Sequence, residues 1–400
     1  MAVVQLPASP AYRLPAELWL QIFKLAASSP ETCFSAKYAA FEPTADDAET
    51  IESACLAVKH SIVLVCRAWC ALGTEMLYED VHIHHGVPAL ERTFQSPAYA
   101  DLQKRVRRAV LPYSQTQTRT YCPLPAVSIL AHCPRLEVLV RPYRRRALFP
   151  QFEFAAEVPP LPNLKRLEWW HDNAASHTGG INALDDVLRN APQLEYLTFS
   201  GQMFLTSLKQ QYHLRLPALT TLRLRAVNAI AIRQLIVWSL PALSHLVLDD
   251  PPADPRALDL LWEAYSDQIR VAELGRCVHF LADDSIRRLL SACRGLRELN
   301  YRIAYTAVPD LSEFTHSAPH LGLCRVGMHA VDCVPNAPGS KALWEHIRNN
   351  FEAYDAQAFP ALREFVLYGE EWQMLRDDRR FCTIDDMVRA RGRRIVFVDW

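Results

Sequence analysis

The sequence is poor in glycine and lacks the short motifs that usually bind phosphate groups. Only 12 of its 400 residues are glycine, and none of the patterns GxGxxG, GxxxxGK[ST], GxSxG or HExxH occurs. A phosphate-binding loop needs glycine because its backbone must approach the ligand closely, whereas the last two patterns carry nucleophilic or zinc-dependent hydrolysis. The sequence therefore favours neither a nucleotide-binding protein nor a hydrolase, and no cofactor is predicted.

Cysteine pairs of the CxxC type are also absent, although the chain contains 11 cysteines. An odd number of scattered cysteines favours neither a disulfide framework nor a zinc ribbon. We therefore expect reduced thiols that serve as small apolar side chains, in a cytoplasmic or nuclear protein.

The chain has no excess of one charge and no long apolar run. Its 43 Lys+Arg and 44 Asp+Glu give a formal charge of -1, so no global attraction to nucleic acid or anionic lipid is expected. No stretch approaches the roughly 18 apolar residues of a membrane span, and the N-terminus lacks the pattern of a signal peptide. With 50% hydrophobic residues in 400, the chain should fold, either as several domains or as a solenoid.

The first ninety residues predict helices followed by a short strand. Pro15 begins an amphipathic helix with apolar residues at Leu18 and Ile22. Residues 28–51 are irregular in pattern, a second helical stretch covers residues 54–77, and residues 78–83 alternate like a strand. Such a small helical unit has too little core to stand alone, so its apolar stripe should pack on a partner or on the next domain.

Three sequence blocks in this region carry a family resemblance. Leu14-Pro15-Ala16-Glu17-Leu18 with Ile22-Phe23, then Val65-Cys66-Arg67-Ala68-Trp69, then Leu77-Tyr78-Glu79-Asp80-Val81 resemble the F-box of fungal F-box proteins. The blocks are spaced more widely than in that family, so residues 29–52 are interpreted as an insertion in a module that spans residues 10–83.

The resemblance implies a three-helix module that binds the Skp adaptor of an SCF-type ubiquitin ligase, and through it the cullin and RING subunits. The positions that match the motif are the candidate adaptor contacts: Leu14, Pro15, Leu18, Ile22, Val65, Cys66 and Trp69. Alternatively, Leu18, Ile22 and Trp69 belong to the interior of the module.

A second pattern repeats through residues 100–400. A phrase of the type Leu-Pro-x-Leu-x-x-Leu, as at 216–222 and 240–246, recurs around anchor positions that are 28, 30, 25, 24, 26, 27, 25 and 41 residues apart. These spacings lie in or just above the range of leucine-rich repeats. The anchors are Leu136, Leu164, Leu194, Leu219, Leu243, Ile269, Leu296, Leu321 and Leu362.

The pattern of each repeat predicts a short strand, a turn and a helix. Alternate strand residues such as Leu222 and Leu224 should point into the core, and helices are expected at 181–190, 229–240, 256–266, 285–292 and 341–354. Because one unit cannot cover its own apolar face, the units should stack. The predicted fold is therefore α/β: a helical F-box-like module followed by a right-handed leucine-rich-repeat solenoid with parallel strands on its concave face. The first and ninth repeats have the weakest pattern, as capping repeats would.

The outward strand positions predict a mixed-charge surface with aromatic residues, which suits the recognition of a protein target of unknown identity. The alternative is a solvated sheet face whose charges pair across strands. The candidate target contacts are Arg166, Glu168, Trp170, Tyr196, Arg223, Arg225, His245 and Arg302.

Other features are interpreted as structural. His82, His84 and His85 have no acidic partner at a useful spacing for a metal site, and Cys66 with Cys70 fits a helix core. The arginines at 141 and 144–146 suit an exposed loop, and those at 389–394 precede an apolar strand, 395–398, in the final cap.

Three functional hypotheses follow. The first is a non-enzymatic substrate receptor of an SCF-type ligase, which holds its target near ubiquitin-transfer subunits. The second is a protein-binding scaffold in which the F-box-like segment only caps the repeats. The third is an enzyme built on His82 and His84. No metal and no membrane partner are predicted.

Overall fold

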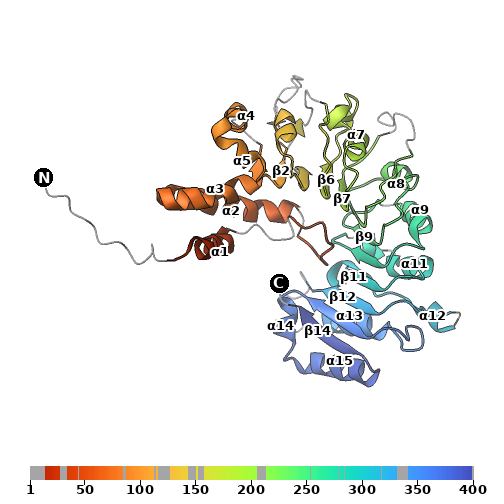
Figure 1. The fold of residues 1–400 in the computed structure, drawn as a ribbon. Coiled ribbons are helices and arrows are strands. Elements are labelled where there is room, and N and C mark those ends of the chain that lie inside the picture. Colours follow the sequence, from red (N-terminus) through yellow and green to blue (C-terminus); the bar gives the residue numbers. More distant parts are fainter. Residues whose placement is uncertain are drawn as a thin grey trace.

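The computed structural model describes most of the chain and places twelve strands in one parallel sheet. The strands lie side by side in chain order, along the inner side of an arc (Figure 1). The described residues are 14–27, 34–43, 45–83, 87–111, 114–115, 127–142, 150–151, 157–204, 213–252, 254–277, 279–282, 284–316, 318–330 and 341–398.

The twelve strands of the sheet are β1 (Asp80–His82), β2 (Arg108–Val110), β4 (Val138–Arg141), β6 (Arg166–Trp170), β7 (Tyr196–Ser200), β8 (Thr221–Arg225), β9 (His245–Leu248), β10 (Val271–Leu274), β11 (Glu298–Arg302), β12 (Arg325–His329), β13 (Glu364–Tyr368) and β14 (Arg394–Val398). Two further strands, β3 (Ser114–Gln115) and β5 (Pro150–Gln151), form a separate antiparallel pair.

The helices follow the strands, and α7, α8, α9 and α11 lie on the outer side of the arc (Figure 1). The α-helices are α1 (Ala16–Ala27), α2 (Ala45–Val65), α3 (Arg67–Glu79), α4 (Val87–Gln95), α5 (Ala100–Gln103), α6 (Asn173–Ser176), α7 (Leu184–Arg189), α8 (Ala229–Leu235), α9 (Pro255–Tyr265), α10 (His279–Ala282), α11 (Ser285–Ala292), α12 (Ser312–His316), α13 (Lys341–Glu352), α14 (Glu371–Leu375) and α15 (Arg379–Ala390). The described residues also form the 3-10 helices η3 (Pro97–Tyr99), η4 (Val127–His132), η5 (Gly180–Asn182) and η7 (Ile303–Tyr305).

Each repeating unit begins with a tight turn that the anchor residue closes. The amide of Leu219 donates to the carbonyl of Leu216, and Leu243 makes the same contact with Leu240. The strand begins two residues after the anchor, and its alternate residues enter the core. Leu222 of β8 therefore lies beside Leu246 of β9, and both are fully buried. Burial of this ladder removes apolar surface from water along the whole sheet, which is the main force that stacks the units.

One predicted anchor is wrong. Leu321 is 70% exposed, whereas Leu323 is fully buried and precedes β12 by two residues. Here the turn is closed by a side chain: the amide of Leu323 donates to Nδ1 of His320 at 3.1 Å. His320 is itself fully buried, so a histidine stands where other units begin the turn with an apolar residue. The repeated phrase therefore matches two positions too early, at Leu321 and not at Leu323.

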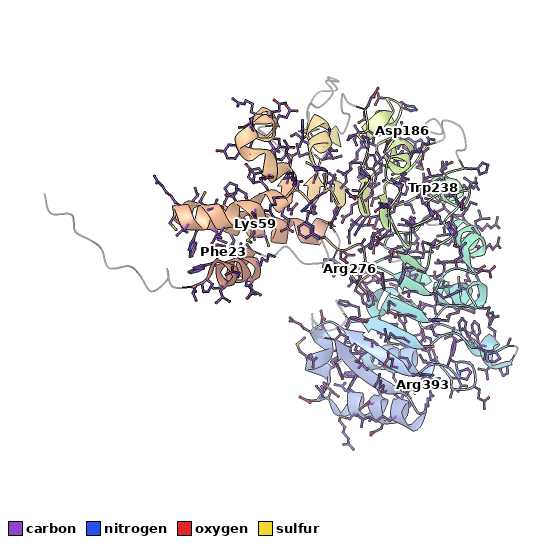
Figure 2. All side chains as sticks on the ribbon, viewed as in Figure 1. Phe23, Lys59, Asp186, Trp238, Arg276 and Arg393 are labelled. Carbon is purple, nitrogen blue, oxygen red and sulfur yellow. The ribbon has the colours of Figure 1, made fainter. Side chains whose placement is uncertain are left out.

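The predicted ends of the array are also wrong. Strands β1 and β2 precede the unit of Leu136, and β14 follows the unit of Leu362, so neither unit is terminal. The prediction that residues 395–398 form a final strand is confirmed. The register of β13 with β14 places Gly392, whose amide donates to the carbonyl of Arg389, at the anchor position of the last unit, so no leucine marks this unit. The next residue, Arg393, is buried (Figure 2).

The N-terminal helices pack against one another beside the first strand. Phe23 and Ala27 of α1 share a small core with Ile62 of α2 and Met76 of α3. The predicted helix at 54–77 is in fact two helices, because Cys66 is extended (φ −161°) and separates α2 from α3. Helix α2 also begins at Ala45, inside the stretch expected to be irregular.

The last strand of the helical module, β1, belongs to the same sheet as the repeats. Strand β1 follows α3 directly and pairs in parallel with β2, with Asp80 beside Arg108. The ion pair between these two residues, 3.0 Å long, is almost fully buried. The helical module is therefore joined to the sheet through a shared strand.

Candidate interaction surfaces

The first candidate surface is an apolar patch on the helical module. Helix α1 has apolar side chains on two faces: Phe23 and Trp19 pack inward, while Leu18 and Ile22 are 43% and 42% exposed. Exposed apolar side chains that gather on one face commonly mark an interaction site. We call this set the α1 patch; its members, which share one side of α1 by helical spacing, are Leu14, Leu18, Ile22 and Leu25. Leu64 and Val65, at the end of α2, are exposed as well.

The predicted adaptor contacts divide between exposed positions and the interior of the module. Leu14, Pro15, Leu18, Ile22 and Val65 are all exposed. Cys66 is half-buried at the start of α3, and Trp69 packs on Trp19 with ring centroids 4.8 Å apart. Trp69 therefore shapes the module from inside. The expected core role of Cys70 is wrong, because this thiol is exposed.

The second candidate surface is the inner face of the sheet, and a segment of the same chain lies on it. Residues 34–43, which we call the strap, leave the helical module and reach the sheet beside β9 and β11 (Figure 1). The Phe34 ring lies under the guanidinium of Arg107 (5.3 Å), next to β2. Phe41, seven residues later, contacts β12 and β13. The strap therefore crosses most of the concave face.

Glu42 binds a group of basic and phenolic side chains on β6, β7 and β8. Its carboxylate accepts hydrogen bonds from Arg166 at 2.7 Å and from the Tyr196 hydroxyl at 3.1 Å, and its backbone carbonyl accepts one from Arg223 at 3.0 Å. All four residues are at most 5% exposed. Burial alone would lower the pKa of Arg166, but the carboxylates of Glu168 and Glu42 raise it above its ordinary value. These charges are therefore buried as pairs.

Tyr38 binds a second group, on β9, β10 and β11. Its hydroxyl donates to Glu273 at 2.7 Å and accepts from the Asn300 amide at 2.8 Å, and its ring stacks on His245 at 5.1 Å. Glu273 also accepts the backbone amide of Phe41 at 2.8 Å. One carboxylate of the sheet thus holds both a side chain and the backbone of the strap.

Phe41 fills an aromatic site at the far end of the strap. Its ring lies 5.1 Å from His329 and 5.0 Å from Tyr368, and the guanidinium of Arg302 lies 5.4 Å above it. Its φ of 57° is in the left-handed region, which costs a bulky residue on the order of 1–2 kcal/mol. Surrounding contacts must offset this strain. The left-handed residue reverses the chain, so that Glu42 returns toward β6.

These findings change the prediction for the target-binding residues. Arg166, Tyr196 and Arg223 face the concave side as expected, but the strap buries them, so they are not an open surface. Glu168, Trp170, Arg225, His245 and Arg302 are half-buried. Sequence reasoning missed Glu273, although this residue lies four positions after the anchor Ile269, as Arg223 lies four positions after Leu219.

The protonation of Glu273 should make stability depend on pH. Burial raises the pKa of Glu273 from about 4.5 to about 7, against the opposing effects of Arg223 and of the donors Phe41 and Tyr38. The folded state thus keeps a proton that the unfolded state loses above pH 4.5. We therefore expect the free energy of unfolding to fall by on the order of 1–3 kcal/mol as pH rises through this window.

Urea unfolding of the wild-type protein and of Glu273→Gln, measured between pH 4.5 and 7.5, checks this expectation. The glutamine cannot titrate, so the free energy of unfolding should fall less with rising pH in the variant than in the wild-type protein. The other charged groups that face this carboxylate, Arg223, Asp249 and Arg302, are present in both proteins. Identical pH profiles for the two proteins would contradict the assignment.

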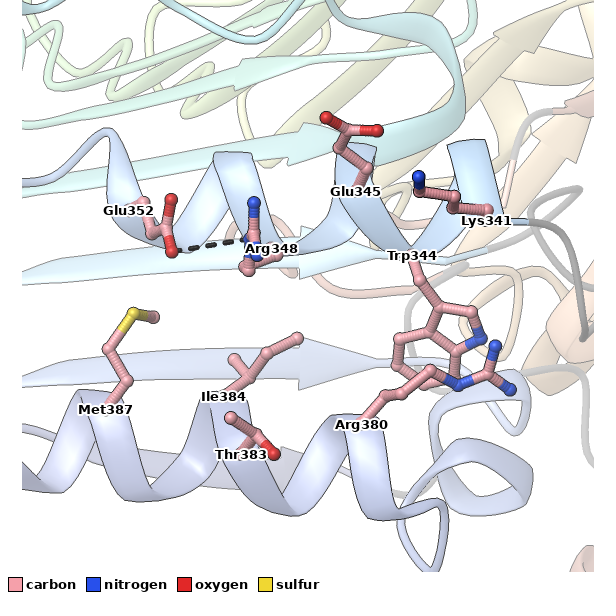
Figure 3. Close-up of a pocket in the computed structure, with 9 residues that line it drawn as sticks. All are labelled: Lys341, Trp344, Glu345, Arg348, Glu352, Arg380, Thr383, Ile384 and Met387. Carbon is pink, nitrogen blue, oxygen red and sulfur yellow. Dashed lines mark ion pairs between the residues drawn. The ribbon is translucent and has the colours of Figure 1, made fainter.

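A third candidate surface is a groove on the outer side of the arc, between α13 and α15. Its volume is about 620 Å³. Trp344, Ile384 and Met387 line it, the guanidinium of Arg380 lies 4.5 Å above the Trp344 ring, and Arg348 pairs with Glu352 at 3.4 Å (Figure 3). The Thr383 hydroxyl donates to the carbonyl of Arg379. The groove offers apolar contacts with a charged rim.

Among the residues that the structure describes, no group of three or more histidine, cysteine, aspartate or glutamate side chains is arranged to hold a metal ion. His82 lies 3.5 Å from Asp80, while His84 and His85 lie outside the described residues. Arg141, expected in an exposed loop, is instead buried against Trp169 (4.7 Å); residues 144–146 are not described. None of the helices in the described ranges combines the length and the apolar character needed to cross a membrane.

No family model matches the chain, and a search of curated proteins finds no match to it.

Proposed function

We propose that this protein is the substrate-recognition subunit of an SCF-type ubiquitin ligase. In this proposal, residues 14–83 form an F-box-like module that binds the Skp adaptor through the α1 patch, and the stacked strand-helix units are leucine-rich repeats that bind a target protein. Other subunits would perform the ubiquitin transfer. The role of this chain is to hold the target at a high effective concentration near the ubiquitin carrier.

The observation that carries the proposal is the two-sided apolar character of α1. Trp19 and Phe23 already supply the contacts that hold α1 on α2 and α3, so Leu18 and Ile22 are not needed for the internal core. Keeping such side chains in water is unfavourable. A partner that buries them accounts for their presence, and they occupy the F-box positions that the resemblance assigns to adaptor contact.

We expect Leu18→Asp combined with Ile22→Asp to weaken binding to the Skp adaptor by at least about 30-fold, because a buried interface would have to accept two unpaired charges. Binding of the purified full-length protein to the adaptor, measured by biolayer interferometry, checks this.

The matched control replaces two exposed apolar residues elsewhere, Leu321→Asp with Met374→Asp, which are 70% and 66% exposed. The control should bind like the wild-type protein. The proposal is overturned if the wild-type protein does not bind the adaptor, or if the α1 variant binds as tightly as the control.

A second candidate function is a protein-binding scaffold without a ligase. The pairing of β1 with β2 and the contacts of the strap favour it, because both would be expected if the helical module only capped the sheet. In that case the α1 patch would show no affinity for the adaptor, so the same measurement separates the two functions.

A further inference from the structure

We propose that the concave face is a peptide-recognition surface and that the strap is a tethered ligand that occupies it. The external partner is then a protein with an exposed segment of the type Tyr-x-x-Phe-Glu, in which the three named residues take the places of Tyr38, Phe41 and Glu42. This inference deepens the target-binding half of the proposed function and rests on that half, not on the adaptor.

The acidic site is formed by the sheet itself. Arg166 pairs with Glu168 at 2.9 Å and Arg223 pairs with Asp249 at 2.6 Å, both partners being residues of the sheet or its edge. The two guanidiniums are thus held in place by carboxylates other than that of Glu42. Pre-positioned donors of this kind suit the binding of a carboxylate from any source. The acid at this position is therefore the main selected feature of the partner.

The tyrosine site distinguishes tyrosine from phenylalanine and from phosphotyrosine. The Tyr38 hydroxyl both donates to Glu273 and accepts from Asn300, so a phenylalanine would remove one hydrogen bond from each of these two buried groups of the sheet. A phosphate would lie against Glu273, with Glu298 nearby, and like charges repel. The surface is therefore expected to select an unmodified tyrosine.

The third site accepts an aromatic ring. His329 and Tyr368 present ring edges to Phe41, and Arg302 covers its face, an arrangement that favours an aromatic side chain over an aliphatic one. In the strap, Phe41 places its ring in this site with a left-handed backbone conformation. A partner segment whose phenylalanine and glutamate fill the places of Phe41 and Glu42 must make the same turn, so this strain is common to the partner and the strap.

The covalent link to the sheet favours the strap over an external partner. A segment joined to its own binding site acts at an effective concentration of the order of millimolar, so a free peptide of the same sequence should compete poorly with an intact strap. It should bind well once the anchoring side chains of the strap are removed. This contrast separates a ligand that can be exchanged from a fixed structural brace.

The test uses a fluorescein-labelled peptide with the sequence of residues 35–43, SAKYAAFEP, and the full-length protein. The strap variant carries Tyr38→Ala, Phe41→Ala and Glu42→Ala. By fluorescence anisotropy, the strap variant should bind this peptide at least about tenfold more tightly than the wild-type protein does. Peptides with Glu→Gln or with phosphotyrosine should bind the variant at least about tenfold more weakly, and a scrambled peptide should not bind.

A strap variant that keeps the circular dichroism spectrum and cooperative melting of the wild-type protein, yet binds the peptide no better, would overturn the proposal. If the variant fails to fold, the proposal is tested instead by amide hydrogen exchange of residues 34–43 in the wild-type protein. Faster exchange with millimolar peptide supports the proposal, and unchanged protection overturns it. The adaptor is absent from both experiments, so failure here leaves adaptor binding by the α1 patch unaffected.

Discussion

Replacing Arg223 by alanine is expected to lower the free energy of unfolding by about 3–5 kcal/mol, because the change removes the nearest basic partner of the buried Asp249 carboxylate and a donor to the backbone of Glu42. Arg223 is 4% exposed, donates to Asp249 at 2.6 Å and to the backbone of Glu42 at 3.0 Å. Its positive charge also keeps the pKa of Asp249 below the ordinary value, although burial alone would raise it. Urea unfolding followed by circular dichroism measures the loss.

A surface ion pair provides the control for this prediction. Arg189 pairs with Asp186 at 3.0 Å with both side chains well exposed to water, so Arg189→Ala should cost less than about 1 kcal/mol. If Arg223→Ala costs no more than this control, Arg223 does not hold the buried charges of the concave face. The strap should also exchange amide hydrogens faster in Arg223→Ala than in Arg189→Ala.

Replacing Arg393 by alanine is the second substitution with a large expected effect, about 3–4 kcal/mol. The guanidinium is 5% exposed and donates to the backbone carbonyls of Tyr354, Asp355 and Phe359. These carbonyls follow the end of α13, where backbone acceptors have no helical partner. Without the donors, each of these three buried or half-buried acceptors would lose one hydrogen bond, although the carbonyl of Phe359 would keep the bond from the Leu362 amide, and a cavity would remain beside β14.

Two variants separate the donors of Arg393 from its volume. Arg393→Leu fills the space with an apolar side chain but donates no hydrogen bond, so it should recover only about half of the loss. Arg394→Ala removes an exposed arginine paired with Glu364 at 2.8 Å and should cost less than about 1 kcal/mol. Thermal unfolding of the three variants checks the order; a fully stable Arg393→Leu would contradict the role of the donors.

Much of the sheet could be predicted from the sequence because its core obeys one spacing rule. A buried residue closes a turn, and the residues three and five positions later enter the core, as Leu222 and Leu224 do after Leu219. The leucine pattern misleads where other residues make the turn, as His320 does before β12 and Gly392 before β14. His320 and Arg393 are buried through hydrogen bonds to backbone groups, and a hydrophobic pattern cannot register them.

The inner face could be predicted only in part. The alternation of the strands correctly assigned Arg166, Tyr196 and Arg223 to the concave side, but nothing local to these residues reveals what covers them. The strap has no repeat and no apolar period, and Glu42 meets Arg166 from 124 positions away along the chain. Contacts between such distant residues depend on the completed three-dimensional arrangement, so the segment appeared in the sequence only as an insertion.

This distance along the chain also has a consequence for synthesis. Tyr38 is bonded to Asn300, 262 residues later. At about 5–20 residues per second, these partners are made roughly 13–50 s apart. The strap therefore emerges from the ribosome long before its site is complete, and its closure is a late, non-local step of folding. During that interval the growing concave face is open, and another polypeptide with suitable side chains could reach it first.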